Sequence, residues 1–235
     1  MSSRRPPLFR KRWFEPTVIV TCVRWYLRFS LSLRDVEELI AERGLSVAHT
    51  SIWRWTQTYG PEVLRRLRGQ VKRKSSTWHI DETFVRVAGR WMYLFRAVDG
   101  GQTVDFYLSE ALGSRSRQTV SQARFGESGQ STAGFARDGL RSYPAAIREL
   151  QKEGHVHRRC RQHTRRYCNN RIESDHRAIK RSLRAMQGPR TMATARVVIQ
   201  GIEAAHIIRK GQVLGITHQN LYGQAWVFSA ILQVA

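Results

Sequence analysis

The spacing of the apolar residues changes near residue 77, and this change limits the possible folds to those that join a helical part to a sheet. Before it, apolar side chains recur every three or four residues, as Leu33, Val36, Leu39 and Ile40 do. After it, they alternate with a period of two in three runs bounded by turn residues, over 77–87, 91–98 and 103–108. We therefore predict an α/β chain, in which helices over 17–70 precede a mixed sheet flanked by helices over 75–235.

The charge of the chain restricts its partners. Its 235 residues carry 40 Lys and Arg against 18 Asp and Glu, a formal net charge of +22. An excess of this size is unusual for a neutral metabolic enzyme and favours a polyanionic partner, for which nucleic acid is the first candidate. The apolar content of 41% is enough for a real core. The most apolar stretch, 17–33, contains Arg24 and Arg28 and is too short to span a bilayer. We expect no membrane partner and a cytoplasmic protein that associates with the nucleoid through DNA.

The N-terminal third predicts a DNA-binding unit behind a basic arm. Residues 1–16 form the arm, which is rich in arginine and contains three prolines. Within 17–70, Ser32 begins a capped helix that Gly44 ends, and a polar second helix runs from about His49 to Tyr59, where Gly60-Pro61 stops it. Two helices joined by a short turn are typical of a helix-turn-helix, although a generic helical hairpin is the alternative. The residues of the second helix that we expect to read the major groove are Thr50, Ser51, Trp53, Arg54 and Gln57.

Three acidic residues occupy unusual places in a chain with so few acids. Asp81 lies in the middle of an apolar strand, Asp138 precedes Gly139 after a short apolar run, and Glu173 lies in the first turn of a helix that begins near Asn170. A buried carboxylate is costly unless it reaches an accessible edge or binds a cation. Each acid also has an ordinary explanation: a core acid with partners, a turn residue, and a helix cap. Their joint occurrence is harder to explain in this way.

A basic segment precedes and includes the Glu173 helix. We expect its arginines and lysines to contact DNA phosphates, whereas a solvated charged face is the ordinary alternative. On the helix, Glu173 shares a stripe with Arg177, Lys180 and Arg184, next to a stripe that should face the core (Ile172, His176, Ile179, Leu183 and Met186). The remaining candidates lie before the helix: Arg158, Arg159, Arg161, Arg165 and Arg166.

The same segment raises the alternative of a zinc site. His157, Cys160, His163 and Cys168 fall within twelve residues, but they form no CxxC pair. The five surrounding arginines disfavour a divalent cation, so a plain basic segment is the better interpretation. The odd number of cysteines, three in all, fits a reducing compartment.

Three sequence blocks around the acids resemble those of the DDE transposases of bacterial and archaeal insertion sequences. The closest likeness is to the short, single-frame group that forms cointegrates, and it covers nearly the whole chain except residues 113–134, where the segments that lead to the second Asp are hard to recognise. The blocks are Trp78-His79-Ile80-Asp81-Glu82-Thr83, Asp138-Gly139-Leu140-Arg141-Ser142-Tyr143-Pro144-Ala145-Ala146-Ile147 and Asn169-Asn170-Arg171-Ile172-Glu173-Ser174-Asp175-His176.

The resemblance implies a fold, a reaction and a set of partners. It implies an RNase H-like, integrase-type catalytic domain over 75–235, in which Asp81, Asp138 and Glu173 match the metal-binding triad position by position. Two Mg²⁺ ions, for which Mn²⁺ would substitute, suit such carboxylate oxygens and the chemistry of phosphodiester cleavage and 3′-hydroxyl transfer. It further implies double-stranded DNA as the substrate, both as terminal inverted repeats and as target, and a homo-oligomer that pairs two DNA ends.

Two other functions remain open at this point. A decayed copy would bind DNA without catalysis, and an RNase H-like nuclease would hydrolyse DNA without joining it. The irregular stretch over 113–134 favours the first alternative, while the second leaves the helix-turn-helix without a role.

Overall fold

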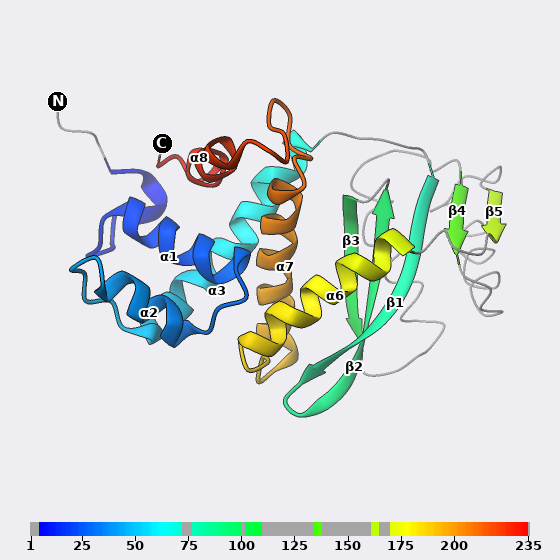
Figure 1. Ribbon diagram of the computed structural model, residues 1–235, viewed down its shortest axis with the longest axis horizontal. Coiled ribbons are helices and arrows are strands. Elements are labelled where there is room, and N and C mark those ends of the chain that lie inside the picture. The colour runs from blue at the N-terminus through cyan, green and yellow to red at the C-terminus, as the bar shows by residue number, and fades with distance from the viewer. Residues whose placement is uncertain are drawn as a thin grey trace. The chain divides into compact units, whose positions relative to one another are not determined.

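The computed structural model describes residues 5–71, 77–99, 102–109, 134–137, 161–164 and 170–234. It divides into two compact units (Figure 1). Unit 1 joins residues 1–72 to residues 181–235, and unit 2 comprises residues 73–180. The irregular stretch over 113–133 lies outside the described residues. Among the described helices, none has a long enough apolar run to cross a membrane.

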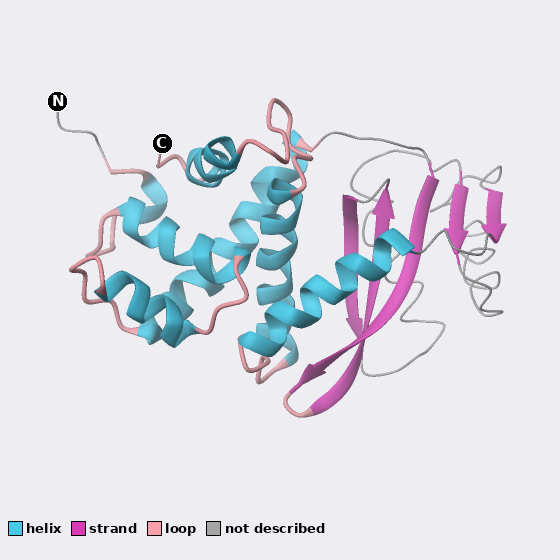
Figure 2. Ribbon diagram, viewed as in Figure 1, coloured by secondary structure: helices cyan, strands magenta, loops and turns pink. Residues whose placement is uncertain are grey.

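Unit 1 is built from helices (Figure 2). Its N-terminal part holds a short 3-10 helix followed by the three expected helices, which are η1 (Pro7–Phe9), α1 (Pro16–Arg28), α2 (Leu33–Ala41) and α3 (His49–Leu67), with η2 (Arg68–Gln70) after them. Its C-terminal part holds α7 (Met192–Arg209) and α8 (Leu221–Ile231), and the end of α6 (Asn170–Ala185), whose first residues belong to unit 2.

The predicted start of α2 is confirmed by a reciprocal cap. The Asp35 amide donates to the Ser32 hydroxyl at 3.1 Å, and the Ser32 amide donates to the Asp35 carboxylate at 2.7 Å. Two of the amides that a helix start leaves without partners are satisfied in this way. Gly44, with φ of +75°, follows the end of α2 in the left-handed region that glycine adopts without strain.

The predicted end of α3 is wrong. The helix does not stop at Gly60-Pro61 but continues to Leu67, with Pro61 inside it. Burial explains the continuation, because Val63 and Leu67 are fully buried beyond the proline. The lost backbone hydrogen bond therefore costs less than exposing this apolar turn would.

Helix α7 is a core helix of unit 1, as its apolar residues predict. Val198, Ile199 and Ile202 are almost completely buried, and α7 packs on α1 and α3. This packing groups the chain differently from the predicted domains, which placed all of 75–235 together. The physical reason is the apolar face of α3, which residues 192–209 cover although they lie more than a hundred positions later in the chain.

Unit 2 contains a five-stranded mixed sheet in the order β3-β2-β1-β4-β5. The strands are β1 (Thr77–Val87), β2 (Arg90–Asp99), β3 (Gln102–Ser109), β4 (Gly134–Arg137) and β5 (Arg161–Thr164). The first three pair antiparallel, as predicted, whereas β4 and β5 run parallel to β1. Three antiparallel strands followed by two parallel ones beside the first form the RNase H-like sheet, so the predicted fold class is confirmed.

The β1–β2 hairpin shows which face of the sheet is buried. Thr83, Val85 and Val87 are buried, while Phe84 between them is 46% exposed. The turn places Ala88 and Gly89 at φ of 49° and 79°, the left-handed pair that a two-residue hairpin turn requires. Over positions 83–87 of β1, odd positions therefore lie on the buried face and even positions on the open one.

Candidate active site and nucleic-acid interface

Strand β1 carries the first candidate acid at the centre of the sheet. Asp81 lies near the middle of β1 and pairs with β2, while β4 pairs with the first residues of β1, Thr77 to His79. Its directly opposed residue on β2 is Arg96. Thr83 and Val85, two and four positions later in β1, are buried.

Arg96 is a residue that our sequence interpretation missed. Its side chain is completely buried, the largest in the core, and it follows Met92 and Leu94 along the buried face of β2. Arginine is rarely buried without compensating charge, and opposite charges at directly opposed strand positions stabilise a sheet. The alternation of β2 was the available signal, because it assigns position 96 to the same face as two apolar residues.

Strand β4 leads directly to the second candidate acid. It ends at Arg137, and Asp138, the next residue in the chain, lies outside the described residues. β4 pairs with β1 in parallel, with Trp78 opposite Phe135 and His79 opposite Ala136. The short strand that the sequence pattern did not reveal before Asp138 is therefore present.

Helix α6 carries the third candidate acid and three of the candidate phosphate contacts. Glu173 lies in its first turn, as predicted. Farther along, Ile179 and Leu183 are buried, whereas Arg177, Lys180 and Arg184 are exposed. The two predicted stripes of this helix are thus present in the described part of it: an apolar stripe directed inward and a cationic stripe in solvent.

The other basic candidates are only partly described. Arg161 lies in β5, and His163 of the disfavoured zinc alternative lies in the same strand. The remaining ones lie outside the described residues, namely Arg158, Arg159, Arg165 and Arg166 together with His157, Cys160 and Cys168. Within the part of the chain that the structure describes, no three His, Cys, Asp or Glu side chains gather as a metal-binding group.

Helix α3 presents its candidate recognition residues to solvent. Thr50 and Arg54 are exposed, and Ser51, Trp53 and Gln57 are partly exposed. The opposite face of the helix, which carries Ile52, Trp55 and Thr56, is buried. Four of the five residues that we expect to contact DNA therefore lie on the open side of α3, whereas the amide nitrogen Nε2 of Gln57 is buried.

A contact between α2 and α3 fixes the start of the candidate recognition helix. The His49 amide donates to the Glu37 carboxylate at 3.1 Å, and the His49 ring nitrogen Nδ1 lies 3.1 Å from the other carboxylate oxygen. Glu37 thus satisfies the first amide of α3 from the neighbouring helix. This contact holds the two helices at a defined angle, which a helix-turn-helix needs to present its second helix.

Comparison with known proteins shows the family of the chain. A family model described as a DDE domain matches residues 75–212. The chain is 32% identical over 203 residues to the transposase for insertion sequence-like element IS431mec of Staphylococcus aureus, covering 86% of this chain and 88% of that protein. The transposase for insertion sequence element IS257 in transposon Tn4003, also of Staphylococcus aureus, has the same identity and coverage.

The structure is also similar to the catalytic core domain of BIV integrase, with a TM-score of 0.44 and 18% identity, over 65% of this chain and 97% of that one. The family model covers more than half of the chain, and the staphylococcal relatives are matched over most of their length. The chain belongs to the DDE transposases of insertion sequences.

Proposed function

We propose that this chain binds the terminal inverted repeats of its own element and catalyses metal-dependent strand cleavage and 3′-hydroxyl strand transfer. In this proposal Asp81, Asp138 and Glu173 hold two Mg²⁺ ions, which Mn²⁺ replaces. Bound Mg²⁺ supplies activation of the attacking oxygen and stabilisation of the leaving oxygen in an in-line phosphoryl transfer. Water is the attacking group in cleavage, and the freed 3′-hydroxyl is the attacking group in joining.

The pairing of β1 with β4 carries the proposal. Ala136 follows its partner His79 by 57 positions, and Asp138 follows Asp81 by the same 57 positions. Asp138 directly follows β4, and β4 pairs with the strand that carries Asp81; neighbouring strands of a sheet are about 4.8 Å apart. Two carboxylates at that spacing suit a hard divalent cation that takes oxygen ligands.

The buried Arg96 lies next to the same site, on β2, the strand that pairs with the other edge of β1. It lies directly opposite Asp81 and brings a permanent positive charge to the buried face. Opposite charges at directly opposed strand positions stabilise a sheet, so we infer that Arg96 stabilises the pairing of β1 and β2 at the candidate site.

The cations of α6 and α3 support DNA as the substrate. Arg177, Lys180 and Arg184 follow Glu173 at helical spacing and are exposed, so they are suited to hold phosphates beside the third acid. The exposed face of α3 supplies side chains that hydrogen-bond to base edges, with Arg54 as the residue suited to guanine. Since two element ends must be brought together, we expect the chain to act as a homo-oligomer on DNA in the cytoplasm.

The test is a joining assay with full-length protein, a donor duplex that carries an element end, a supercoiled target and Mg²⁺. Asp81→Asn, Asp138→Asn and Glu173→Gln should each lower joining by about a thousandfold or more, since ligand loss removes most of the metal's contribution. Binding of the end duplex should survive. Glu110→Gln, which removes one negative charge elsewhere in residues 75–212, should join as the wild type does.

Other outcomes of this assay would change either the role of a residue or the function of the chain. Joining that persists in any of the three variants removes that residue from the metal site. Nicked DNA without recombinants from the wild type indicates a hydrolytic nuclease. End binding with neither product, in Mg²⁺ and in Mn²⁺, indicates a catalytically decayed copy that acts by occupying DNA.

A further inference from the structure

The basic arm is fixed on the candidate recognition helix. Phe9 is completely buried, and its ring stacks on Tyr59 of α3, with centroids 4.8 Å apart and planes 13° apart. The Tyr59 hydroxyl donates to the Leu8 carbonyl at 3.2 Å. Phe14 packs edge-on against Trp55, with ring centroids 5.3 Å apart. We call residues 5–15 the docked arm.

Two arginines of the docked arm make hydrogen bonds that fold the arm back on itself and attach it to α3. Arg5 donates to the Arg12 carbonyl and, at 2.8 Å, to the Glu15 carboxylate. Arg12 donates from Nε to the Tyr59 hydroxyl at 3.2 Å, and its guanidinium lies 5.8 Å from the centre of that ring. These contacts fold the arm into a compact loop, so the residues between them have a defined position on α3.

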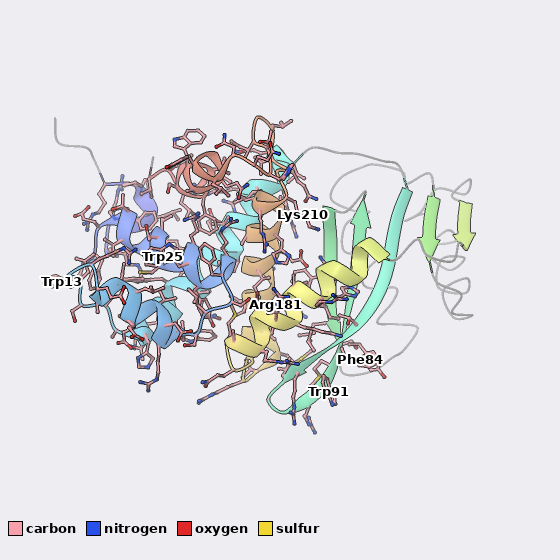
Figure 3. All side chains as sticks on the ribbon, viewed as in Figure 1. Trp13, Trp25, Phe84, Trp91, Arg181 and Lys210 are labelled. Atoms are coloured by element: carbon pink, nitrogen blue, oxygen red, sulfur yellow. The ribbon has the colours of Figure 1, made fainter. Side chains whose placement is uncertain are left out.

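The side chains at the tip of this loop point into solvent. Arg10 and Lys11 are exposed, and Trp13 is 98% exposed, at the outer edge of unit 1 in Figure 3. A tryptophan so exposed contributes almost nothing to the core. If its ring were buried in a contact with a partner, about 150–250 Å² of surface would be removed from water. A rigid backbone thus presents two cations and one large aromatic ring together.

The docked arm packs against α3 on the side that carries Trp55 and Tyr59, which adjoins the face that we expect to contact DNA. Phe14, next to Trp13, touches Trp55, and Trp55 directly follows the exposed Arg54. On a helix, positions 54 and 55 are separated by about 100° of rotation, so the docked arm packs on a flank of α3 and not on the recognition face itself. A duplex that contacts Arg54 would therefore have its backbone within reach of this side of α3.

We propose that Arg10, Lys11 and Trp13 form a second DNA contact of the helix-turn-helix. Arg10 and Lys11 bind phosphates next to the groove that α3 enters, and the Trp13 ring packs against the sugars of the adjacent minor groove. The chemistry is that of duplex DNA, since the tip combines positive charge with an apolar ring that a polyanionic backbone and its sugars complement. The proposal rests on the proposed function of the chain in binding element ends.

The experiment measures binding of the full chain to two labelled duplexes of equal length, one with an element end and one unrelated, over a series of salt concentrations. The double variant R10Q/K11Q should bind both duplexes about tenfold more weakly near physiological salt, and the slope of log affinity against log salt should become about 1.8 smaller, as expected for two lost phosphate contacts. Trp13→Ala should weaken binding further, and Trp13→Phe should restore part of the loss.

The control removes the same charge elsewhere in unit 1. R196Q/R209Q replaces two exposed arginines of α7 and should leave affinity and salt slope unchanged. Thermal unfolding of R10Q/K11Q and Trp13→Ala should match the wild type, because all three side chains are exposed. Phe9→Ala, which removes the anchor of the docked arm, should weaken DNA binding in the same way as R10Q/K11Q.

Failure of this inference is distinct from failure of the proposed function. If the wild type does not prefer the element end, the proposed function fails. If it prefers the end but R10Q/K11Q and Trp13→Ala bind like the wild type, the second DNA contact does not exist. If Trp13→Ala changes the oligomeric state in sedimentation without changing DNA affinity, Trp13 belongs to an interface between copies, and the proposal is overturned.

Discussion

Gly201 lies where α7 packs closely against α1 and α3. A Cβ atom there would lie 2.6 Å from Leu27 Cδ2 of α1 and 2.8 Å from Cδ1, and Leu27 is completely buried. A Cβ at Gly60 of α3 would in turn lie 3.4 Å from the Gly201 Cα atom. The two glycines therefore allow α3 and α7 to meet while Leu27 fills the space beside them.

Gly201→Ala should destabilise the protein by about 1–3 kcal/mol, because the added methyl group displaces a packed side chain. Gly69→Ala is the matched control, since its Cβ would meet nothing within 4 Å. That control should change the free energy of unfolding by less than about 0.5 kcal/mol. Urea unfolding of both variants checks the prediction, and an equal effect of the two would show that the packing at Gly201 is unimportant.

Single residues differed in how well the sequence predicted them. Asp81 stands out because a carboxylate interrupts an apolar alternating run, and alternation requires no knowledge of the fold. Trp13 gave no such signal, because the docking of Phe9 on Tyr59 joins positions fifty residues apart. The alternation of β2 could have indicated that Arg96 is buried, but its position opposite Asp81 required the pairing of the two strands.

At the scale of elements, a cluster of charges ties α3 to α8. The Glu62 carboxylate accepts from Arg65 at 2.7 Å and from Arg66 at 2.5 Å. Arg66 also donates to the Ile231 carbonyl, at the end of α8, at 2.9 Å. The hydrogen bonds from Arg65, followed by those from Arg66, lower the pKa of Glu62 to about 2, well below its ordinary value of 4.5.

Glu62→Gln should lower stability at neutral pH and not at pH 2. A carboxyl whose pKa is lower in the folded than in the unfolded chain stabilises the fold fully above the unfolded value of 4.5. This stabilisation is lost as the pH falls through 4.5 toward about 2. Thermal unfolding of the wild type and of Glu62→Gln between pH 2 and 7 checks it. A difference between them that is constant with pH would contradict the role of this charge.

The sequence predicted elements where their local signals agreed. β1 and α2 match their expected ranges because alternation, capping and turn residues all indicate the same boundaries. The end of α3 was missed because Gly60-Pro61 is a local stop signal that tertiary burial of Val63 and Leu67 overrides. β5 was missed because its residues, Arg161 to Thr164, are polar and show no alternation of apolar side chains.

At the scale of the molecule, the two ends of the chain fold together. Residues 1–72 and 181–235 form one unit, in which α7 covers α1 and α3. Periodicity within a segment predicts that a helix has an apolar face but not which distant face it covers. The predicted division at residue 75 could not anticipate this, whereas the three acidic blocks and their spacing could identify the family without any packing information.

A fragment of residues 1–72 should therefore not fold well by itself. It would expose the apolar surface that α7 covers, including the surroundings of Tyr59 and Val63, which are completely buried in the whole chain. The same fragment joined by a flexible linker to residues 181–235 should unfold cooperatively. Circular dichroism during heating distinguishes them, and an equally cooperative transition in the short fragment would show that the N-terminal helices are an independent domain.

The central claim is that Asp81, Asp138 and Glu173 share one pair of metal ions. Anomalous diffraction from crystals of the full chain with a cleaved element end and Mn²⁺ tests it most directly. We predict two manganese peaks about 3.5–4 Å apart, with carboxylate oxygens of all three residues as ligands. Manganese held by other side chains, or three carboxylates too far apart to share the two ions, would contradict the account.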